Sequence, residues 1–598
     1  MAIILEVRGL ALQMIPVIVA LVISSLALLA SPMLSDATGK TTDTTPRGAT
    51  VPFTTIEAEA PDNRTTGQVI KMTGLPTRTT MTPELEASGR AYVELNKIGD
   101  YLDFSNMRAA NTIVLRHCIP DAPTGDGLTA TLSLYVNNTL RQSLTLSSKY
   151  NWLYGEAGQN GQSDDPAAGT PHVFWDETRF FIKDGVKQGD TIRLQKDAAD
   201  TAAFYRVDSI DLETAPDPLP PPAAGTYLSV IDYGANGSDT ADETAAIQAC
   251  IAAAKEQKKI VWLPAGTYYQ KAKFILDGVQ LRGAGMWHTR LIGNVEETGW
   301  GGALGFTLSG DGPAVSDLFI ESALHTRRGT PGGKPFTGAM GKCSNWRVEN
   351  VWMTHTHVAF WMSGVTGGTV RGCRVRFTYA DGININRGSR NNLVEHNHVR
   401  GTGDDGIALL SEKERTPNPS ANNTVRSNTV IATWWGHNLD VAGGNGHVAE
   451  NNLLADNPLF GCLTINLPGA YPMYPQTSAT IRHNTILRGG GNYVGQRRGA
   501  IWIYAGDTTI SDVVLADNEI IDPIFRGIHL TGSGSQSITF ERNLIVAPGE
   551  DGIVIESKVK GSGVFKDNTV RDVKPGFQPF VNNGGDDYAV TATGNSWQ

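Results

Sequence analysis

The sequence is poor in cysteine, in charge and in helical periodicity, and each shortage excludes a class of protein. Five cysteines in 598 residues are too few and too scattered for a disulfide framework or a zinc site, so we expect them to be small buried residues. Charged residues make up 18 % of the chain and its net charge is −10, which argues against nucleic acid or an anionic membrane as a partner. Helical periodicity disappears after residue 258, whereas glycine is abundant at 66 residues, and this profile indicates β structure.

One long apolar run is present, at the N-terminus. Arg8 precedes an apolar stretch over about residues 10–30, so residues 1–37 are predicted to be a signal peptide and the protein to be secreted. The stretch is also long enough for a retained membrane anchor, and the sequence leaves this alternative open. Residues 38–54 are polar and rich in threonine, and they are predicted to form a flexible leader.

Residues 55–214 are predicted to form a small antiparallel β-sandwich. Short runs of alternating apolar and polar residues recur between turn residues, for example over 91–95, 101–104 and 129–136. A proline-rich stretch over residues 215–225 then indicates a stiff linker and a domain boundary.

The sandwich segment resembles the carbohydrate-binding β-sandwiches of families 6 and 35. The similarity lies in its opening Ile-Glu-Ala-Glu, its middle Gly-Asp-Tyr-Leu-Asp-Phe and its closing Val-Asp-Ser-Ile-Asp-Leu. In that group two early acids and a late aspartate hold a structural calcium ion, and the resemblance implies Glu57, Glu59 and Asp211 for this role. The alternative is that these three acids are solvated residues at strand edges.

Residues 226–598 are predicted to form a right-handed parallel β-helix, so the fold class is all-β. Near its start, residues 240–258 carry Ile247 and Ile251 on one face, which predicts an amphipathic helix. This opening resembles the start of the β-helix proteins of the pectate-lyase superfamily, in which such a helix covers the apolar N-terminal end of the coil.

A short phrase with one asparagine recurs along the β-helix segment at several intervals of 24 or 25 residues, and at longer intervals where a loop intervenes. One asparagine per coil predicts a ladder of side-chain amides that bond up and down the stack. Between the asparagines lie Ile-x-Ile strands, whose alternation points the apolar side chains into the coil. The predicted ladder consists of Asn350, Asn397, Asn428, Asn452, Asn484, Asn518, Asn543 and Asn568.

Two of these strands follow an Asp-Gly pair, at Asp381 and at Asp405 24 residues later, and Asp404 lies directly beside the second. Because neighbouring rungs of a sheet are roughly 4.8 Å apart, Asp381, Asp405 and His437 are predicted to form a column on one face of the coil. An Asp-Gly pair alone is an ordinary turn signal, as at residues 551–552. Three acids and a histidine in three consecutive coils favour a catalytic role over that structural one.

Three carboxylates without a nucleophilic serine or cysteine arrangement suit hydrolysis of a glycosidic bond. We expect Asp381 and Asp405 to hold the attacking water and Asp404 to protonate the leaving oxygen, although an exchange of roles between Asp404 and Asp381 stays open. An arrangement with room for that water predicts inversion at the anomeric carbon. No cofactor is expected for this chemistry.

The Asp-Gly, Asp-Asp and Gly-His series resembles the polygalacturonases of glycoside hydrolase family 28, which are inverting β-helix enzymes. The Arg-Ile-Lys phrase with which that family binds a uronate carboxylate has no match, because the corresponding strand reads Cys-Leu-Thr-Ile-Asn over residues 462–466. Without that cation a neutral sugar is the better substrate.

The chain is more similar to glycoside hydrolase family 87, the α-1,3-glucanases and mycodextranases, from about residue 55 to its end. In that family a β-sandwich precedes a β-helix, and one aspartate is followed about a coil later by an adjacent pair. The resemblance implies catalytic roles for Asp381, Asp404 and Asp405.

Sugar-binding candidates flank the acids. Trp434 and Trp435 precede His437, and an aromatic face can stack on a pyranose ring. Each candidate alone is better explained as a surface or ladder residue, but together they make this face rich in side chains that suit a sugar. The candidates are His355, His357, Tyr379, Asn384, Asn386, Trp434, Trp435, His437 and Asp440.

We therefore predict a secreted, monomeric, inverting endo-hydrolase whose partner is a polysaccharide. Its substrate is predicted to be α-1,3-glucan, such as the fungal-wall or dental-plaque polymer, or a mixed α-1,3/α-1,4-glucan. Two alternatives are a polygalacturonase-like hydrolase and a lyase or epimerase that acts on uronates, although the central column offers no Lys or Arg to abstract a proton. A third alternative is a non-catalytic carbohydrate-binding β-helix protein, for which Asp381, Asp404 and Asp405 would be dispensable.

Overall fold

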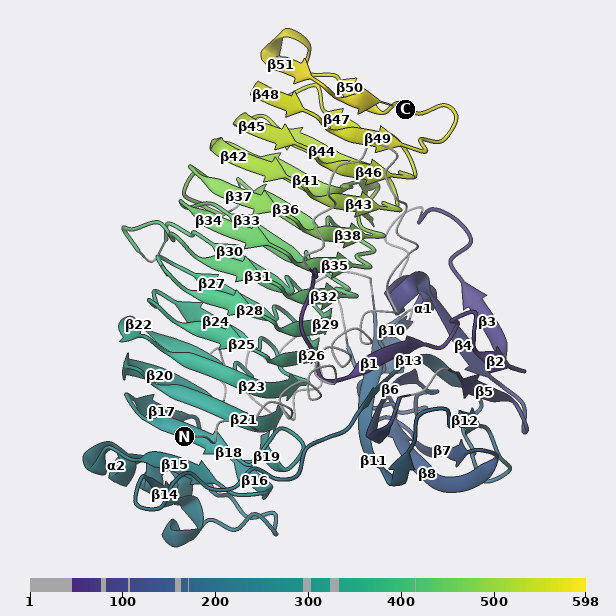
Figure 1. Ribbon diagram of the computed structural model, residues 1–598, viewed down its shortest axis with the longest axis vertical. Coiled ribbons are helices and arrows are strands. Elements are labelled where there is room, and N and C mark those ends of the chain that lie inside the picture. Colours follow the sequence, from purple (N-terminus) through teal and green to yellow (C-terminus); the bar gives the residue numbers. More distant parts are fainter. Residues whose placement is uncertain are drawn as a thin grey trace, which may run out of the picture.

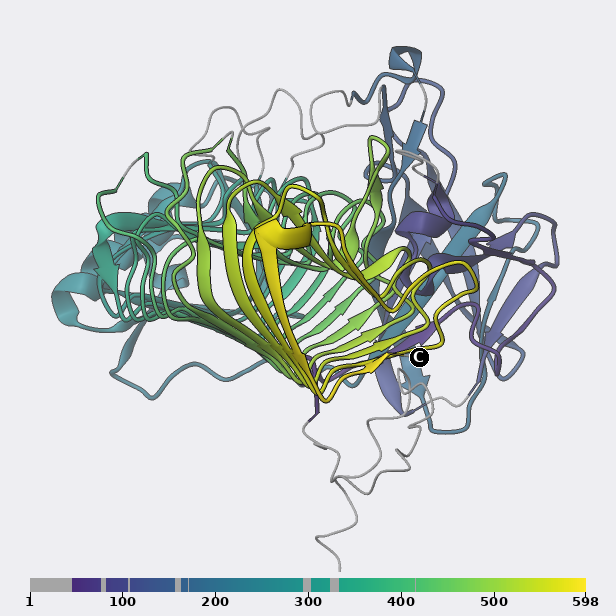
Figure 2. The same ribbon diagram turned by 90° about the horizontal axis from the view of Figure 1, so that it is seen from above.

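The computed structural model divides the chain into two β domains that lie side by side, a sandwich built from β1 to β13 and a long coil built from β14 to β52 (Figures 1 and 2). The predicted export signal lies outside the described residues. In the part of the chain that is described, no helix is long and apolar enough to cross a membrane. The described residues are 46–76, 82–105, 108–155, 163–169, 171–293, 303–322, 333–414, 416–469 and 471–597.

The sandwich consists of two antiparallel sheets, as the alternating runs predict. One has the order β11-β6-β13-β4-β3, with β1 also paired to β13, and the other has the order β2-β5-β12-β7-β8. Their inner faces share one apolar core, which includes Val93, Leu102 and Leu132. The strands are β1 (Thr54–Glu57), β2 (Arg64–Thr65), β3 (Gln68–Lys71), β4 (Ala91–Leu95), β5 (Tyr101–Phe104), β6 (Ala110–Cys118), β7 (Thr129–Val136), β8 (Thr139–Ser147), β9 (Trp152–Tyr154), β10 (Pro171–Val173), β11 (Asp176–Val186), β12 (Ile192–Gln195) and β13 (Tyr205–Glu213), with the short helix α1 (Pro83–Glu86).

The second domain is a parallel β-helix, which confirms the predicted fold class. Each strand pairs in parallel with its counterpart one coil further along the chain, and the coil has a 25-stranded and a 12-stranded parallel sheet. The 12-stranded sheet carries the candidate site. It contains β17 (Phe274–Asp277), β20 (Phe306–Asp311), β22 (Phe336–Ser344), β24 (Phe360–Ser363), β27 (Ile383–Asn386), β30 (Ile407–Leu410), β33 (Leu439–Ala442), β36 (Leu463–Leu467), β41 (Gly499–Ala505), β44 (Arg526–Gly532), β47 (Ile553–Ile555) and β50 (Phe580–Asn582).

The 25-stranded sheet forms the other walls of the coil. Its strands are β14 (Tyr227–Ser229), β15 (Ile260–Leu263), β16 (Gly266–Gln270), β18 (Gln280–Gly283), β19 (Thr289–Gly293), β21 (Ala314–Glu321), β23 (Arg347–Thr354), β25 (Thr369–Arg371), β26 (Arg374–Thr378), β28 (Leu393–Glu395), β29 (His398–Thr402), β31 (Thr424–Arg426), β32 (Thr429–Ile431), β34 (His447–Glu450), β35 (Leu453–Ala455), β37 (Ala479–Arg482), β38 (Thr485–Leu487), β42 (Ile510–Ala516), β43 (Glu519–Ile521), β45 (Ser535–Glu541), β46 (Leu544–Val546), β48 (Lys560–Lys566), β49 (Thr569–Arg571), β51 (Tyr588–Thr593) and β52 (Ser596–Trp597). A two-stranded hairpin of β39 (Asn492–Tyr493) and β40 (Gln496–Arg497) lies outside both sheets.

Alternation along the strands fills the coil. Ile383, Ile407 and Leu439 stand in register on β27, β30 and β33 and are fully buried in the apolar core. The helix α2 (Thr244–Gln257) covers the N-terminal end of the coil and buries Ile247 and Ile251 against the same core, as predicted (Figure 1). All five cysteines are buried and unpaired.

The asparagine ladder forms as predicted over most of its length. Seven consecutive amide-to-amide hydrogen bonds of 2.9–3.1 Å run from Asn397 to Asn595. Asn595 was not part of the predicted ladder. Asn350 does not join, since it is exposed and its amide donates to Asp317. The residue before each ladder asparagine has positive φ, for example 57° at Asn451, so each asparagine follows a left-handed bend that turns its amide along the stack.

Buried ion pairs join the two domains. Arg374, Arg376 and Arg400 on β26 and β29 of the coil extend toward the sandwich. Their partners are Glu213 at 2.5 Å from Arg374, Glu177 at 2.9 Å from Arg376, and Glu177 and Asp211 at 2.6 Å each from Arg400. Because an unpaired buried charge is costly, these pairs specify one docking geometry.

Part of the predicted leader also lies against the coil. The amide of Gly48 donates to the carbonyl of Asn451 at 2.8 Å, and the amide of Ala49 donates to Oγ1 of Thr429 at 2.9 Å. Arg47 forms an ion pair with Glu519 at 3.0 Å. Residues 47–49 are therefore anchored to the β-helix domain.

Candidate active site

The three acids lie on two neighbouring coils, directly before β27 and β30. The amide of Gly382 donates to the carbonyl of Asp405 at 2.9 Å, and the amide of Gly406 donates to that of His437 at 2.7 Å. These backbone bonds stack Asp381, Asp405 and His437 in consecutive rungs, as the repeat predicts. Asp381 and Asp405 are each 8 % exposed, and Asp404 is more exposed than either.

A chain of amides orients the carboxylate of Asp381. Nδ2 of Asn384 donates to Oδ1 of Asp381 at 3.1 Å, and Nδ2 of Asn386 donates to Oδ1 of Asn384 at 2.6 Å. The hydroxyl of Ser363 donates in turn to Oδ1 of Asn386 at 2.6 Å. The two asparagines predicted as sugar contacts therefore fix an acid, and Asn386 is fully buried.

His437 orients the carboxylate of Asp405. Its backbone amide and its Nδ1 lie 2.9 and 2.8 Å from the same Oδ1 of Asp405. Burial lowers the pKa of His437, but the charge of Asp405 and this hydrogen bond outweigh burial and raise the pKa above its ordinary value. The contact holds the imidazole ring against the carboxylate of Asp405.

Asp440 is a fourth acid next to this pair. It is buried on β33 and accepts hydrogen bonds from Oγ1 of Thr464 at 2.6 Å and from the amide of Asn466 at 3.3 Å. Burial and the charge of Asp405 raise the pKa of Asp440 to about 7. Asp405, His437 and Asp440 are the only three His, Cys, Asp or Glu side chains in the described chain whose ligand atoms all lie within 4.8 Å of one another.

An aromatic wall that the sequence analysis missed lies beside His437. The ring of Phe460 is 5.2 Å and the ring of Trp502 is 5.9 Å from the imidazole, and the guanidinium of Arg498 lies 4.2 Å from the Trp502 ring. Trp502 stands between Ile501 and Ile503, which point inward, so strand alternation was the signal that could have placed it on the outer face.

Four predicted sugar contacts have side chains that are buried against other protein groups, which argues against their contact with a substrate. Trp434 is 2 % exposed and packs on Phe174 of the sandwich, and Trp435 packs on Phe460 and Tyr493. The other two are Tyr379, which is buried in the same cluster, and His355, which pairs with Asp176 of the sandwich at 2.8 Å. His357 remains close to the acids, since its carbonyl accepts the amide of Ala380 at 2.7 Å.

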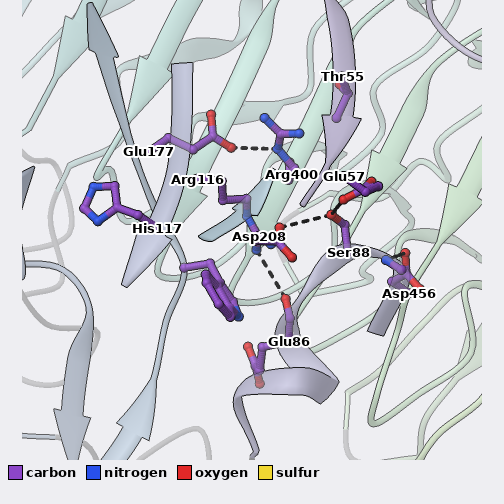
Figure 3. A network of polar contacts seen from close by, with 12 residues as sticks. Thr55, Glu57, Glu86, Ser88, Arg116, His117, Glu177, Asp208, Arg400 and Asp456 are labelled. Carbon is purple, nitrogen blue, oxygen red and sulfur yellow. Dashed lines mark hydrogen bonds and ion pairs between the residues drawn. The ribbon is translucent and has the colours of Figure 1, made fainter. Parts of the chain in front are cut away.

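The calcium prediction needs one correction. Asp211 has other partners, since it accepts hydrogen bonds from Arg400 and from Thr55, both at 2.6 Å. Asp208 lies close to Glu57 instead, because the hydroxyl of Ser88 is 2.6 Å from Oε2 of Glu57 and 3.0 Å from Oδ2 of Asp208 (Figure 3). Asp208 also forms a buried ion pair with Arg116. A β-bulge between Val207 and Ser209 interrupts the pairing of β13 with β6 at Asp208, so alternation counted from Asp211 does not give the position of Asp208.

The donor set of Glu57, Glu59 and Asp208 suits a cation. Burial, with the charges of the neighbouring acids, raises the pKa of Glu57 to about 8 and that of Glu59 to about 9. Oε2 of Glu59 and Oδ1 of Asp208 are buried without a hydrogen-bond partner among the described residues. Mutually repelling carboxylates with unused oxygens fit calcium, although they lie further apart than the ligand atoms of Asp405, His437 and Asp440. Glu57 and Glu59 line a cavity of about 730 Å³ between the two domains.

Comparison with known proteins agrees with this geometry. Residues 50–215 match the family model of the α-1,3-glucanase catalytic domain D1, and residues 239–555 match that of domain D2. These segments coincide with the sandwich and with most of the β-helix, so the sandwich belongs to the catalytic unit. The specific resemblance to carbohydrate-binding families 6 and 35 stays a prediction. Comparison with curated protein sequences gave no significant match.

Several solved structures are similar to the chain over almost its whole length. The Agl-KA catalytic domain is 26 % identical with a TM-score of 0.78 and covers 93 % of this chain and 100 % of that one. The catalytic unit of a thermostable α-1,3-glucanase of glycoside hydrolase family 87 from Streptomyces thermodiastaticus is 25 % identical with a TM-score of 0.77, covering 92 % and 97 %. A third, a catalytic domain of the same family in complex with nigerose, is 26 % identical with a TM-score of 0.80, covering 92 % and 100 %. The chain thus belongs to the α-1,3-glucanases of glycoside hydrolase family 87 and is a glycoside hydrolase of α-1,3-glucan.

Proposed function

We propose that the protein is a secreted, monomeric enzyme that cleaves α-1,3-glucan internally and inverts the anomeric carbon. The stack of Asp381 and Asp405 on neighbouring rungs, with Asp404 beside them, carries this proposal. In one similar enzyme, alanine variants at three aspartates were crystallised with nigerose or tetrasaccharides. The second of those positions follows the first by 23 residues and the third is adjacent to the second, which is also the spacing of Asp381, Asp404 and Asp405.

In the proposed mechanism, Asp404 gives its proton to the glycosidic oxygen as the bond to the anomeric carbon breaks. Asp381 and Asp405 hold a water on the opposite face of the sugar and take up a proton from it as its oxygen bonds to that carbon. Asp404 suits the role of acid because it is the most exposed of the three. The fixed orientation of the other two suits the positioning of water, because a misplaced group loses most of its effect.

The polysaccharide is proposed to lie across the outer face of the 12-stranded sheet. Outward positions of β27, β33 and β41 carry Asn384, Asp440 and Trp502 in one register column, and the aromatic wall adjoins His437. Aromatic faces beside hydrogen-bonding side chains suit a neutral sugar chain. The family assignment supports neither a lyase or epimerase that acts on uronates nor a non-catalytic carbohydrate-binding protein.

Product analysis tests the proposal. Incubation with insoluble α-1,3-glucan should release a ladder of α-1,3-linked oligosaccharides, whereas α-1,4-glucan and polygalacturonate should stay intact. Release of glucose alone from the first minutes would contradict internal cleavage. An unsaturated product absorbing in the ultraviolet would contradict hydrolysis.

We also propose that Glu57, Glu59 and Asp208 hold a structural calcium ion in the sandwich. Their raised pKa values and unused oxygens support this proposal. The ion has no part in the chemical step, because the set belongs to the sandwich and the catalytic acids to the coil. When bound, it would supply a positive charge that offsets the repulsion between the acids.

A further inference from the structure

A cluster of apolar residues connects the sandwich to the catalytic acids. It contains Leu153 and Phe174 from the sandwich, and its other members come from the coil. All of its members are buried, and the mechanism proposed above uses none of them. We call it the interdomain aromatic cluster, and it consists of Leu153, Phe174, Phe377, Tyr379, Trp434, Trp435 and Leu459.

Phe174 is the sandwich residue at the centre of the cluster. It is 1 % exposed, and its ring lies 4.6 Å from the ring of Trp434 at an interplanar angle of 75°. Its backbone is fixed from both sides, since its amide donates to the carbonyl of Asn151 at 2.7 Å and its carbonyl accepts Nδ2 of the same asparagine at 3.2 Å. His172 also faces the Trp434 ring, at 5.7 Å, and is itself held by Glu86 at 2.9 Å. The sandwich thus presents a rigid surface to Trp434.

Trp434 in turn lies against the residue that precedes Asp404. A Cβ at Gly403 would be 2.3 Å from Cζ2 of Trp434 and 2.5 Å from the carbonyl oxygen of Tyr379, so this position tolerates no side chain. The amide of Gly403 donates to the carbonyl of Ala380 at 3.2 Å. Gly403 is therefore enclosed between the preceding coil and the indole.

The far side of Asp404 is equally close to the next coil. A Cβ at Gly436 would lie 2.6 Å from Oδ1 of Asp404 and 2.7 Å from the amide nitrogen of Asp405. Trp434 and Gly436 are two positions apart in the same loop, so a shift of the indole moves both boundaries of Asp404.

We infer that Phe174 of the sandwich, acting through Trp434 and Gly403, is a positioning residue for Asp404. The sandwich then serves the reaction by holding the loop that carries the proton donor. This inference rests on the proposed role of Asp404. Displacing a proton donor by about 1 Å lowers the rate roughly 100-fold. A cavity behind the indole should therefore lower kcat more than it weakens substrate binding.

The test compares Phe174→Ala with the control Phe53→Ala. Phe53 has an equally large ring that is 5 % exposed and contacts Arg374 and His398 at the domain interface. It is distant from Asp404 in the sequence, and neither Arg374 nor His398 belongs to the interdomain aromatic cluster. Turnover is measured on an α-1,3-linked glucotetraose and on a dinitrophenyl α-nigeroside, whose leaving group needs no proton. We expect Phe174→Ala to lower kcat on the tetrasaccharide roughly 10- to 100-fold, with KM changed less than about threefold. The loss on the activated substrate should be much smaller, Phe174→Leu should restore most of the rate, and Phe53→Ala should keep kcat.

A double-mutant cycle decides whether the effect passes through the indole. If it does, Phe174→Ala combined with Trp434→Ala should be no slower than Trp434→Ala alone. Trp434→Ala, which removes the indole itself, should show the same selective loss even if Phe174→Ala folds poorly. Additive effects, or equal losses with Phe53→Ala, would overturn the inference.

The same assays separate this inference from the proposed mechanism. Asp404→Asn should lose the tetrasaccharide reaction and retain much of the activated one. If it loses both equally, the assignment of Asp404 as the acid is wrong. The contrast between Phe174 and Phe53 and the double-mutant cycle still decide whether the sandwich positions the acid loop.

Discussion

Among single residues, Asp404 and Asp551 show how context separates a catalytic acid from a turn. Both precede strands of the same sheet, but Asp404 stands next to Asp405, which stacks on Asp381, whereas Asp551 accepts the amide of Gln578 at 2.8 Å. The chain therefore contains a matched control for its own active site.

Replacing Asp404 with asparagine removes a transferable proton while keeping the shape of the side chain. General acid catalysis contributes typically 10²- to 10⁴-fold, so we expect kcat on α-1,3-glucan to fall about 1,000-fold. Asp551→Asn should leave kcat unchanged. Reducing-sugar release from both variants measures this, and wild-type turnover by Asp404→Asn would refute the assignment.

Asp440 should make the enzyme less stable at neutral pH than at acidic pH. The pKa of Asp440 is about 7 in the folded state and 3.8 in the unfolded state. As the pH rises from about 4 to 7, the carboxyl group ionises in the unfolded state but stays protonated in the folded state, so the free energy of unfolding falls. Asp440→Asn keeps the Oδ1 acceptor for Thr464 and removes this penalty, so it should stabilise the protein by up to about 4 kcal/mol at pH 8 and hardly at all at pH 4. Thermal unfolding across this range measures the difference, and a gain that does not depend on pH would contradict the account.

At the scale of the element, the asparagine ladder locks neighbouring coils. Nδ2 of Asn452 donates to Asn484 at 2.9 Å, while its Oδ1 accepts Nδ2 and the backbone amide of Asn428 at 3.1 and 2.9 Å. The donors and acceptors are buried, so removing one amide leaves its neighbours unsatisfied.

Asn452→Ala should therefore lower the free energy of unfolding by about 3 kcal/mol, since each buried polar group left unsatisfied costs roughly 1–3 kcal/mol. The adjacent Asn451 has φ of 57° and lies outside the ladder, so Asn451→Gly should be neutral or slightly stabilising. Chemical denaturation of both variants tests this contrast. An equal loss in both would show that the bend, and not the amide, stabilises the coil.

The elements of the coil were predictable because their signals are local. Alternation placed Ile383 and Ile407 inside, and the interval of one coil placed Asp381 and Asp405 on adjacent rungs. The burial of Trp434, His355 and Asp211 was not predictable in this way, because each of these side chains is covered by a surface of the other domain. Docking is a long-range event, and no period in the chain encodes which outer face of the coil the sandwich covers.

At the scale of the whole molecule, the sandwich and the coil act as one catalytic unit. Buried ion pairs from Arg374, Arg376 and Arg400 fix their arrangement, and the interdomain aromatic cluster joins the sandwich to the acid loops. The cation site proposed at Glu57, Glu59 and Asp208 adjoins the same interface (Figure 3). Its state should therefore affect the stability of the whole molecule.

Calcium should raise the unfolding temperature, and more so at high pH. Without a cation, the raised folded pKa values of Glu57 and Glu59, about 8 and about 9, lower stability as the pH rises from about 4.5 toward 9. Bound calcium removes that penalty and adds about 2.7 kcal/mol when its free concentration is a hundredfold above Kd. Thermal unfolding with calcium and with chelator at pH 6 and pH 9 measures this.

Two variants test the site itself. Calcium should no longer raise the unfolding temperature of Glu59→Gln, whereas it should still raise that of the control Asp586→Asn, which changes an exposed acid. A rise in the unfolding temperature of Glu59→Gln on adding calcium would contradict the site.

The central claim is that Asp404 protonates the leaving oxygen while Asp381 and Asp405 direct water to the opposite face of the sugar. Proton NMR of the sugar released in the first minutes from an α-1,3-linked oligosaccharide tests it most directly. The account predicts that the β-anomer appears first and converts to the α-anomer by mutarotation. Initial release of the α-anomer would mean retention and a covalent intermediate, and it would contradict the assigned roles of all three acids.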